Sequence, residues 1–186
     1  MRVFPFFSVS GFSNCYLIEP EEGDCAILID PGHLSDGLIN HLQERNLLPI
    51  AILLTHTHAN HCSGAAVIRK IFGTEIYAAT DIPELQTNLI VDGQELCFNS
   101  LTFKVLSTPG HSADSLCYAL PPLIFTGDTL EAGTIGSYPT PAARTELIRT
   151  LREKLLSRAD YELVLPGHGP PTTIGIEGRF NIHLQD

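Results

Sequence analysis

The sequence has little positive charge and no basic block. Its 186 residues contain 11 lysines and arginines against 21 aspartates and glutamates, which gives a formal net charge of −10. No stretch of the chain gathers the few basic residues into a stripe, so electrostatic attraction to nucleic acid or to anionic lipid is not expected. We expect a small-molecule substrate as the partner, with no nucleic acid and no membrane.

Long apolar runs are also absent. The longest, such as AILL at 51–54, are far shorter than the roughly 20 residues that span a bilayer. The N-terminal MRVFPFFSVSGFSN has Arg2 as its one positive residue. It lacks a sustained apolar core and a small-residue cleavage site, so it is not typical of a signal peptide. These absences predict a soluble, cytoplasmic protein.

The sequence has no CxxC pair, no repeat and no linker-like stretch. An odd number of cysteines, scattered mostly through apolar segments, favours reduced and buried thiols over a disulfide framework. The length and a hydrophobic content of 44% fit one globular core of roughly 100 to 200 residues. We therefore predict a single domain over residues 1–186. The cysteines concerned are Cys15, Cys25, Cys62, Cys97 and Cys117.

Strand-like and helix-like periods alternate along the chain. Apolar spacing predicts helices near 35–46, 65–72 and 142–156, and Gly73 is expected to end the second of them. Residues 74–126 favour sheet, because their short apolar runs are rich in β-branched and aromatic residues. Further strands are expected near 1–8, 14–19, 25–30, 50–54 and 162–165, and a last short helix near the end. The alternation predicts a layered α/β architecture and leaves the strand order open.

The chemistry is expected where the strands stop. His56, His58 and His61 follow the apolar strand at 50–54, so their imidazoles converge at one strand-to-helix turn. Neutral imidazole nitrogen is a preferred ligand of zinc and similar metals, and a site with few protein ligands leaves a position open for water. This arrangement indicates a catalytic rather than a structural metal site.

Three later loops repeat the same pattern of an apolar run that ends in a Gly- or Pro-containing turn. STPGHS carries His111, FTGDT carries Asp128 and LPGHG carries His168. Loops at strand ends on a rigid scaffold are where functional residues are concentrated. The recurrence of such loops favours metal binding by these residues, whereas the isolated histidines are interpreted as structural: His33, His41 and His183.

Taken in order, HTHANH at 56–61, His111, Asp128 and His168 resemble the signature of the metallo-β-lactamase superfamily. SNCYLI, IDPG, TPGHS, TGDTL and PGHGPPTTIGIEGRFN are similar to its glyoxalase II-like, or hydroxyacylglutathione hydrolase-like, branch. The resemblance implies a four-layer αββα sandwich. It also implies that His56, His58 and His111 hold a first metal ion and that His61, His168 and residue 60 hold a second. Asp128 would bridge the two ions, and Asp30 would order the loop beneath them.

Residue 60 departs from the family pattern, because this chain has Asn60 where the family has aspartate. An amide offers a neutral carbonyl oxygen instead of a carboxylate, so the second site loses charge compensation and should bind its cation more weakly. Asn60 also cannot serve as a base for the water. The alternatives are a tight first site with a partly filled second one, full tolerance of the amide, or loss of catalysis.

The resemblance implies one or two Zn²⁺ ions, with iron or manganese as alternatives, and a hydrolytic mechanism in which a metal-activated water attacks a carbonyl carbon. The catalytic positions are Asp128 and Asn60. Cys62 is interpreted as a small buried helix residue rather than a nucleophile. Three hydroxyl side chains that border the ligands are predicted to orient them, namely Thr108, Ser112 and Thr129.

A small thioester, such as an acylated glutathione or a related thiol ester, is the predicted substrate, followed by a lactone or another acyl ester. The chain stops soon after PGHGPPTTIGIEGRFN, before the helical extension that helps glyoxalase II hold glutathione, and Ser137 replaces an arginine that family members often carry. Two other classes stay open. One is a non-haem iron dioxygenase that acts on persulfides, and the other is a ligand-binding protein that Asn60 has left without turnover.

Overall fold

The computed structural model of the chain describes residues 1–9 and 11–185 and forms two compact units. The first unit comprises Met1–Ile90 with Cys97–Leu101. The second comprises Val91–Leu96 and the chain from Thr102 onward. Among the described residues, no helix has both the length and the apolar character needed to cross a membrane.

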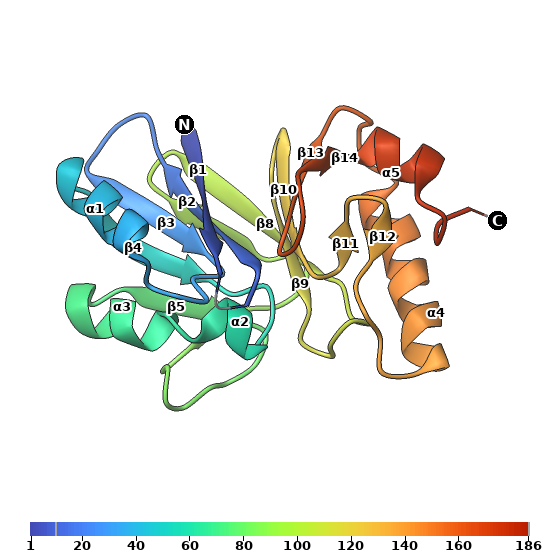
Figure 1. Ribbon diagram of the computed structural model, residues 1–186, viewed down its shortest axis with the longest axis horizontal. Helices are drawn as coiled ribbons and strands as arrows, with labels where there is room; N and C mark the ends of the chain where they lie inside the picture. The colour runs from blue at the N-terminus through green and yellow to red at the C-terminus, as the bar shows by residue number, and fades with distance from the viewer. Residues whose placement is uncertain (10, 186) are drawn as a thin grey trace. The chain divides into compact units, whose positions relative to one another are not determined.

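The first unit is a six-stranded sheet in the order β1-β2-β3-β4-β5-β6 (Figure 1). β2 pairs antiparallel with both β1 and β3, whereas β3, β4, β5 and β6 pair in parallel. The strands are β1 Arg2–Ser8, β2 Ser13–Glu19, β3 Cys25–Ile29, β4 Leu48–Leu53, β5 Glu75–Ala78 and β6 Asn88–Leu89. The helices are α1 Asp36–Glu44, α2 Ala59–Cys62 and α3 Ala65–Phe72.

The helix ends follow the expected local chemistry. Ser35 caps α1 by accepting a hydrogen bond from the backbone N–H of Leu38 at 3.2 Å. Gly73 ends α3 in the left-handed conformation with φ of 72°, which confirms the predicted stop. Alternate residues of β2 to β5 form one hydrophobic core with the apolar side chains of α1 and α3, such as Leu38 and Ile68. Both helices therefore pack against the same face of this sheet.

The second sheet has six strands in the order β14-β13-β10-β9-β8-β7 and, apart from Cys97–Leu101, belongs to the second unit, as does a small β11-β12 hairpin. β9 pairs antiparallel with both β8 and β10, and β13 runs parallel to β10. The strands are β7 Glu95–Phe98, β8 Leu101–Ser107, β9 Leu116–Leu120, β10 Leu123–Gly127, β11 Leu130–Glu131, β12 Thr134–Ile135, β13 Leu163–Pro166 and β14 Thr172–Thr173. The helical segments are α4 Pro141–Thr150, a π-helical turn Leu151–Leu155 and α5 Ile174–Phe180.

A second core joins this sheet to its helices. Leu147, Leu151 and Leu155 from α4 and the π-helical turn pack with buried residues of β8, β9, β10 and β13. The helix expected near 142–156 is thus present, although its last part widens from α- to π-helical geometry. In Figure 1, α4 lies along one side of the second unit, and α5 follows the short strand β14.

All five cysteines are free, as predicted. Cys15, Cys25 and Cys117 are buried, and burial raises the pKa of the Cys117 thiol to about 11. The expectation of buried thiols is wrong for Cys97, which is exposed. Cys97 lies on β7, where burial changes from one residue to the next, and the strand's period of two places Leu96 inside and Cys97 outside.

Candidate metal-binding site

In the first unit, the parallel pairing of β3 and β4 gathers the predicted site residues at one edge of the sheet. Ile29 at the end of β3 pairs with Leu53 at the end of β4, and the backbone N–H of Asp30 donates to the carbonyl of Leu53 at 3.2 Å. Since β3 and β4 both end at this edge of the sheet, Asp30 from the IDPG loop meets the segment that begins at Thr55.

The carboxylate of Asp30 is the centre of a buried hydrogen-bond network. Its Oδ1 accepts from the backbone N–H of Thr55 at 2.7 Å, and its Oδ2 accepts from the Thr55 hydroxyl at 2.6 Å. Oδ2 also lies 3.0 Å from Nδ1 of His61. Asp30 adopts a φ of 50°, a conformation that is uncommon outside glycine and persists where surrounding contacts hold it. The Asp30 carboxylate therefore orders the loop that carries the histidines.

This network assigns the protons of two imidazoles. An ionised carboxylate only accepts, so Nδ1 of His61 donates to Asp30. The Thr55 hydroxyl gives its one proton to Asp30 and so accepts from Nδ1 of His56, 3.0 Å away. Both rings then keep a lone pair on Nε2. Nε2 of His56 lies 3.0 Å from Nδ1 of His58, which makes two neighbouring nitrogen donors.

Asn60 is fixed through its backbone. Its carbonyl accepts a hydrogen bond from the Ser13 hydroxyl at 2.6 Å, and a side chain on Gly32 would overlap the same carbonyl. Gly32 is thus required for the close approach of the IDPG loop to α2. The turn that carries Asn60 is held between this loop and the start of β2.

In the second unit, three predicted ligands also share one edge of the sheet. β8 and β10 are each antiparallel to β9 and therefore run in the same direction, as does β13. Their carboxyl ends lead to His111, Asp128 and His168 respectively. Oδ2 of Asp128 lies 3.6 Å from Nε2 of His111 and 3.5 Å from Nε2 of His168.

A backbone carbonyl fixes the orientation of His111. Nδ1 of His111 lies 2.8 Å from the carbonyl oxygen of Ser137. Because a carbonyl oxygen only accepts, Nδ1 carries the proton and Nε2 keeps the lone pair, facing Asp128. A side chain on Gly136 would overlap the backbone carbonyl of Asp128 and would lie 3.2 Å from Nδ1 of His111. The segment 136–137 is therefore packed directly against both residues.

These donors fit a metal ion. Two ligands at about 2.0–2.1 Å from a tetrahedral metal are about 3.3 Å apart, and the separations within each unit, from 3.0 Å for His56–His58 to 3.6 Å for His111–Asp128, lie around that value. Within the first unit, potential ligand atoms of Asp30, His56 and His61 lie within 4.8 Å of one another. Since the Asp30 oxygens already accept from Thr55 and His61, the imidazoles are the donors offered to a metal.

Other residues named by the sequence take smaller roles. The thiol of Cys62 donates to the Thr57 carbonyl at 3.4 Å and is partly exposed rather than buried, because α2 is a single short turn at the surface. The hydroxyls of Thr108 and Thr129 lie 2.9 Å apart, and that of Ser112 lies 2.7 Å from that of Ser115. Among the isolated histidines, His41 packs against Phe4 with ring centroids 4.3 Å apart, His33 is exposed and His183 is half-buried.

Two groups that orient the proposed ligands were not predicted from the sequence. Thr55 connects Asp30 to His56, and the Ser137 carbonyl orients His111. The first letter of the THTH motif is a hydroxyl residue next to a ligand, which is a signal that could have identified Thr55. No residue type reveals a backbone carbonyl as a hydrogen-bond acceptor, so the role of Ser137 left no signal in the sequence.

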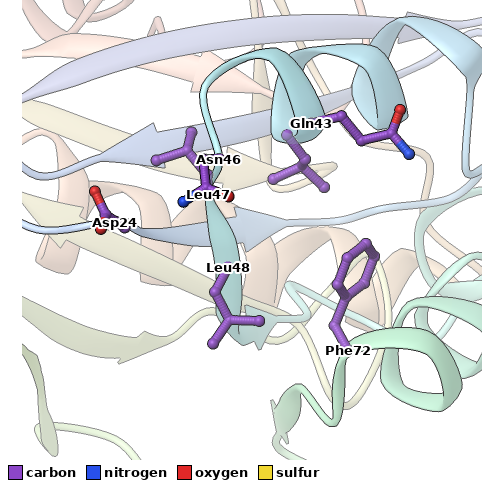
Figure 2. A pocket seen from close by; sticks show the side chains of 7 residues that line it. Asp24, Gln43, Asn46, Leu47, Leu48 and Phe72 are labelled. Atoms are coloured by element: carbon purple, nitrogen blue, oxygen red, sulfur yellow. The ribbon is translucent and has the colours of Figure 1, made fainter.

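A pocket of about 410 Å³ in the first unit contains none of the predicted ligands (Figure 2). Leu47, Leu48 and Phe72 line it together with polar residues such as Asp24 and Asn46. Leu48 is the first residue of β4, whereas His56 and His58 follow the last. The pocket therefore lies at the amino end of this parallel strand, away from the candidate site.

The chain matches the family model described as metallo-beta-lactamase superfamily over residues 9–102 and 88–168. It is 32% identical to hydroxyacylglutathione hydrolase GloC of Haemophilus influenzae, and the match covers 92% of each chain. The GloC match agrees with the glyoxalase II-like resemblance drawn from the motifs.

Solved structures share the fold. ETHE1 from Myxococcus xanthus superimposes with a TM-score of 0.90 at 29% identity, over 98% of this chain and 84% of that one. A protein crystallised in a di-iron-bound form, TTHA1623, gives a TM-score of 0.81 at 32% identity, over 96% and 98% of the two chains. The predicted αββα fold class is thus confirmed. With the family model matched over most of its length, the chain belongs to the metallo-β-lactamase superfamily.

Proposed function

We propose that the chain is a metal-dependent hydrolase that cleaves a small thioester. The observation that carries the proposal is the hydrogen bonding of Nδ1 in three imidazoles: His61 with Asp30, His56 with Thr55 and His111 with the Ser137 carbonyl. Each contact leaves Nε2 as a donor for a metal. A metal site needs several imidazole rings oriented in this way, whereas a histidine with only a structural role does not need such an orientation.

The proposed ligands are those of the family pattern. His56, His58 and His111 would hold one ion, His61 and His168 with Asn60 would hold a second, and Asp128 would serve both. A divalent metal bound there would lower the pKa of a water ligand toward about 7 and would polarise the carbonyl group of the substrate. The protein's own contribution is to orient His56, His61 and His111 so that each keeps the lone pair on Nε2.

A thioester is favoured as the substrate for two reasons. The relative from Haemophilus influenzae is named a hydroxyacylglutathione hydrolase and matches 92% of this chain. A thiolate is also a good leaving group, so the reaction needs no strong general acid to protonate it. That suits a site in which Asn60 replaces a carboxylate and cannot exchange protons.

Metal content and hydrolysis, measured together, test the proposal. The purified protein should contain one or two divalent ions per chain and release thiol from acylated glutathione or another small acyl thioester. His56→Ala should lose the first ion and with it hydrolysis, whereas His33→Ala, which removes an exposed histidine, should keep both properties. A metal-loaded protein that hydrolyses no thioester, lactone or ester but binds one of them tightly would instead support a binding role without turnover.

An iron-dependent oxidation is the second candidate, because a neighbour at 32% identity was solved in a di-iron-bound form. Metal identity and a substrate assay together separate the two chemistries. Zinc with thiol release supports hydrolysis. Iron with oxygen uptake on a glutathione persulfide supports the dioxygenase and would replace the hydrolase proposal.

A further inference from the structure

A buried carboxylate near the end of the chain lies outside the predicted ligand set. Glu177 lies in the first turn of α5 and is 1% exposed. Its oxygens accept from the backbone N–H of Gly133 at 3.0 and 3.1 Å, from the hydroxyl of Thr172 at 2.7 Å and from the amide of Asn181 at 2.8 Å. Burial of a charge is costly unless hydrogen bonds compensate it, so this arrangement of neutral donors indicates a specific positioning task.

Glu177 holds the β11-β12 hairpin in place. Gly133 forms the turn between the two strands and has a φ of 76°. Next to it, the Thr134 carbonyl accepts from the Asn181 amide at 2.9 Å. Each strand of the hairpin has only two residues, and a ribbon this short is not stable by itself. α5 therefore supplies the contacts that fix it.

Both ends of this hairpin meet predicted ligands. It begins two residues after Asp128 and ends at Ile135, which precedes Gly136 and Ser137. Gly136 packs against the Asp128 carbonyl, and the Ser137 carbonyl accepts from Nδ1 of His111. A shift of the hairpin would therefore disturb the backbone at Asp128 and the acceptor that sets the His111 tautomer.

We infer that Glu177 and Asn181 are positioning residues for the metal-binding site. Through the β11-β12 hairpin they keep His111 protonated at Nδ1 and aimed through Nε2 at Asp128. The inference rests on the proposed function only in that His111 and Asp128 bind metal. It gives the closing IGIEGRFN segment a role in metal affinity in addition to its packing.

Glu177→Gln tests the inference with little change of shape. Glutamine keeps one acceptor oxygen but replaces the other with an NH2 group that cannot accept from the Gly133 N–H, so the hold on the hairpin should weaken. Glu162→Gln is the matched control, since Glu162 is also buried in the second unit but accepts from Arg158 at 2.6 Å. Both variants should lower stability. Only Glu177→Gln should affect His111.

Two measurements separate positioning from packing. The first is ¹⁵N NMR of the His111 imidazole in metal-free protein at a pH of about 8, where histidine is ordinarily neutral. Wild type and Glu162→Gln should show Nδ1–H, and Glu177→Gln a mixture of tautomers. The second is competition titration with Zn²⁺, in which Glu177→Gln should bind on the order of 10- to 100-fold more weakly and Glu162→Gln as wild type does.

Asn181→Ala should change the His111 tautomer and the Zn²⁺ affinity in the same direction as Glu177→Gln, but less. It replaces Glu177→Gln in the test if that variant does not fold. Unchanged tautomer and unchanged Zn²⁺ affinity in the folded variants would overturn the inference. If wild type binds Zn²⁺ and shows these differences but hydrolyses no thioester, the proposed function fails and the inference stands.

Discussion

The hydroxyl of Thr55 lies between the Asp30 carboxylate, 2.6 Å from its Oδ2, and Nδ1 of His56, 3.0 Å away. One hydroxyl proton can serve only one of these neighbours, and the carboxylate cannot donate. The direction of the hydrogen bonds is therefore fixed from His56 through Thr55 to Asp30. A side chain outside the proposed ligand set thus decides which nitrogen of His56 would be offered to a metal ion.

Removal of this hydroxyl should weaken metal binding. Thr55→Val keeps the volume but leaves His56 without its acceptor, so both tautomers become accessible. We expect Zn²⁺ affinity to fall by about 10-fold or more and stability to fall by about 1–3 kcal/mol. Affinity is measured by competition titration and stability by urea unfolding of the metal-free protein.

Thr74→Val provides the control for that experiment. The Thr74 hydroxyl is also buried in the first unit and donates to the Pro49 carbonyl at 2.7 Å, at the other end of β4 from the histidines. Thr74→Val should lower the stability of the protein by a similar amount without lowering its affinity for Zn²⁺. Equal affinity losses in the two variants would show that Thr55 acts only through general stability.

Asn60→Asp should raise the number of metal ions bound per chain. The added carboxylate supplies the charge that the second site lacks. Asn40→Asp adds the same charge at an exposed position of α1 and should leave the stoichiometry unchanged. The measurement is elemental analysis after dialysis against a fixed free metal concentration. If wild type already binds two ions and Asn60→Asp adds none, the amide is tolerated.

Metal removal should lower thermal stability as well as activity. Binding at 100 times the dissociation constant stabilises the folded state by about 2.7 kcal/mol, which for a chain of this size corresponds to about 5–10 °C in Tm. A chelator should lower the Tm of wild type by this amount in differential scanning calorimetry. The decrease should be smaller for His56→Ala, which lacks a ligand of the first ion, and an equal decrease in both proteins would refute ligation by His56.

Glu19 should make stability depend on pH under acidic conditions. Burial by itself would raise its pKa, but the hydrogen bonds from Arg45 and the charges of Arg2 and Arg45 outweigh burial and hold the pKa below its usual range. Arg2 and Arg45 each approach the carboxylate to 2.7 Å. Because the folded pKa is depressed, this stabilisation is complete above the ordinary glutamate pKa of about 4.3 and is lost as the pH falls through the folded value.

Glu19→Gln should therefore destabilise the protein by about 2 kcal/mol at pH 7. The arginines keep part of their solvation, with side chains 55% and 35% exposed, so the loss stays below that of a fully buried pair. The difference from wild type should shrink as urea unfolding is repeated below about pH 4.3. A difference that is constant with pH would mean that the Glu19 charge contributes nothing.

The sequence by itself determined the local part of this protein. The spacing of HTHANH after an apolar strand places His56, His58 and His61 at one turn, since strand and turn geometry depend on neighbouring residues. Capping chemistry likewise fixes the start of α1 at Ser35 and the end of α3 at Gly73. The repeated loops that carry His111, Asp128 and His168 indicate one kind of chemistry because each follows a strand.

Only the tertiary structure decided how these ligands are held. Asp30 meets Thr55 because β3 and β4 pair in parallel, 25 residues apart in the chain. The Ser137 carbonyl and the Glu177 carboxylate act over separations of 26 and 44 residues. A backbone carbonyl carries no residue identity, and a glutamate near the end of a chain is ordinarily solvated. The orientation of the imidazoles therefore depends on strand pairing and burial, which local sequence does not encode.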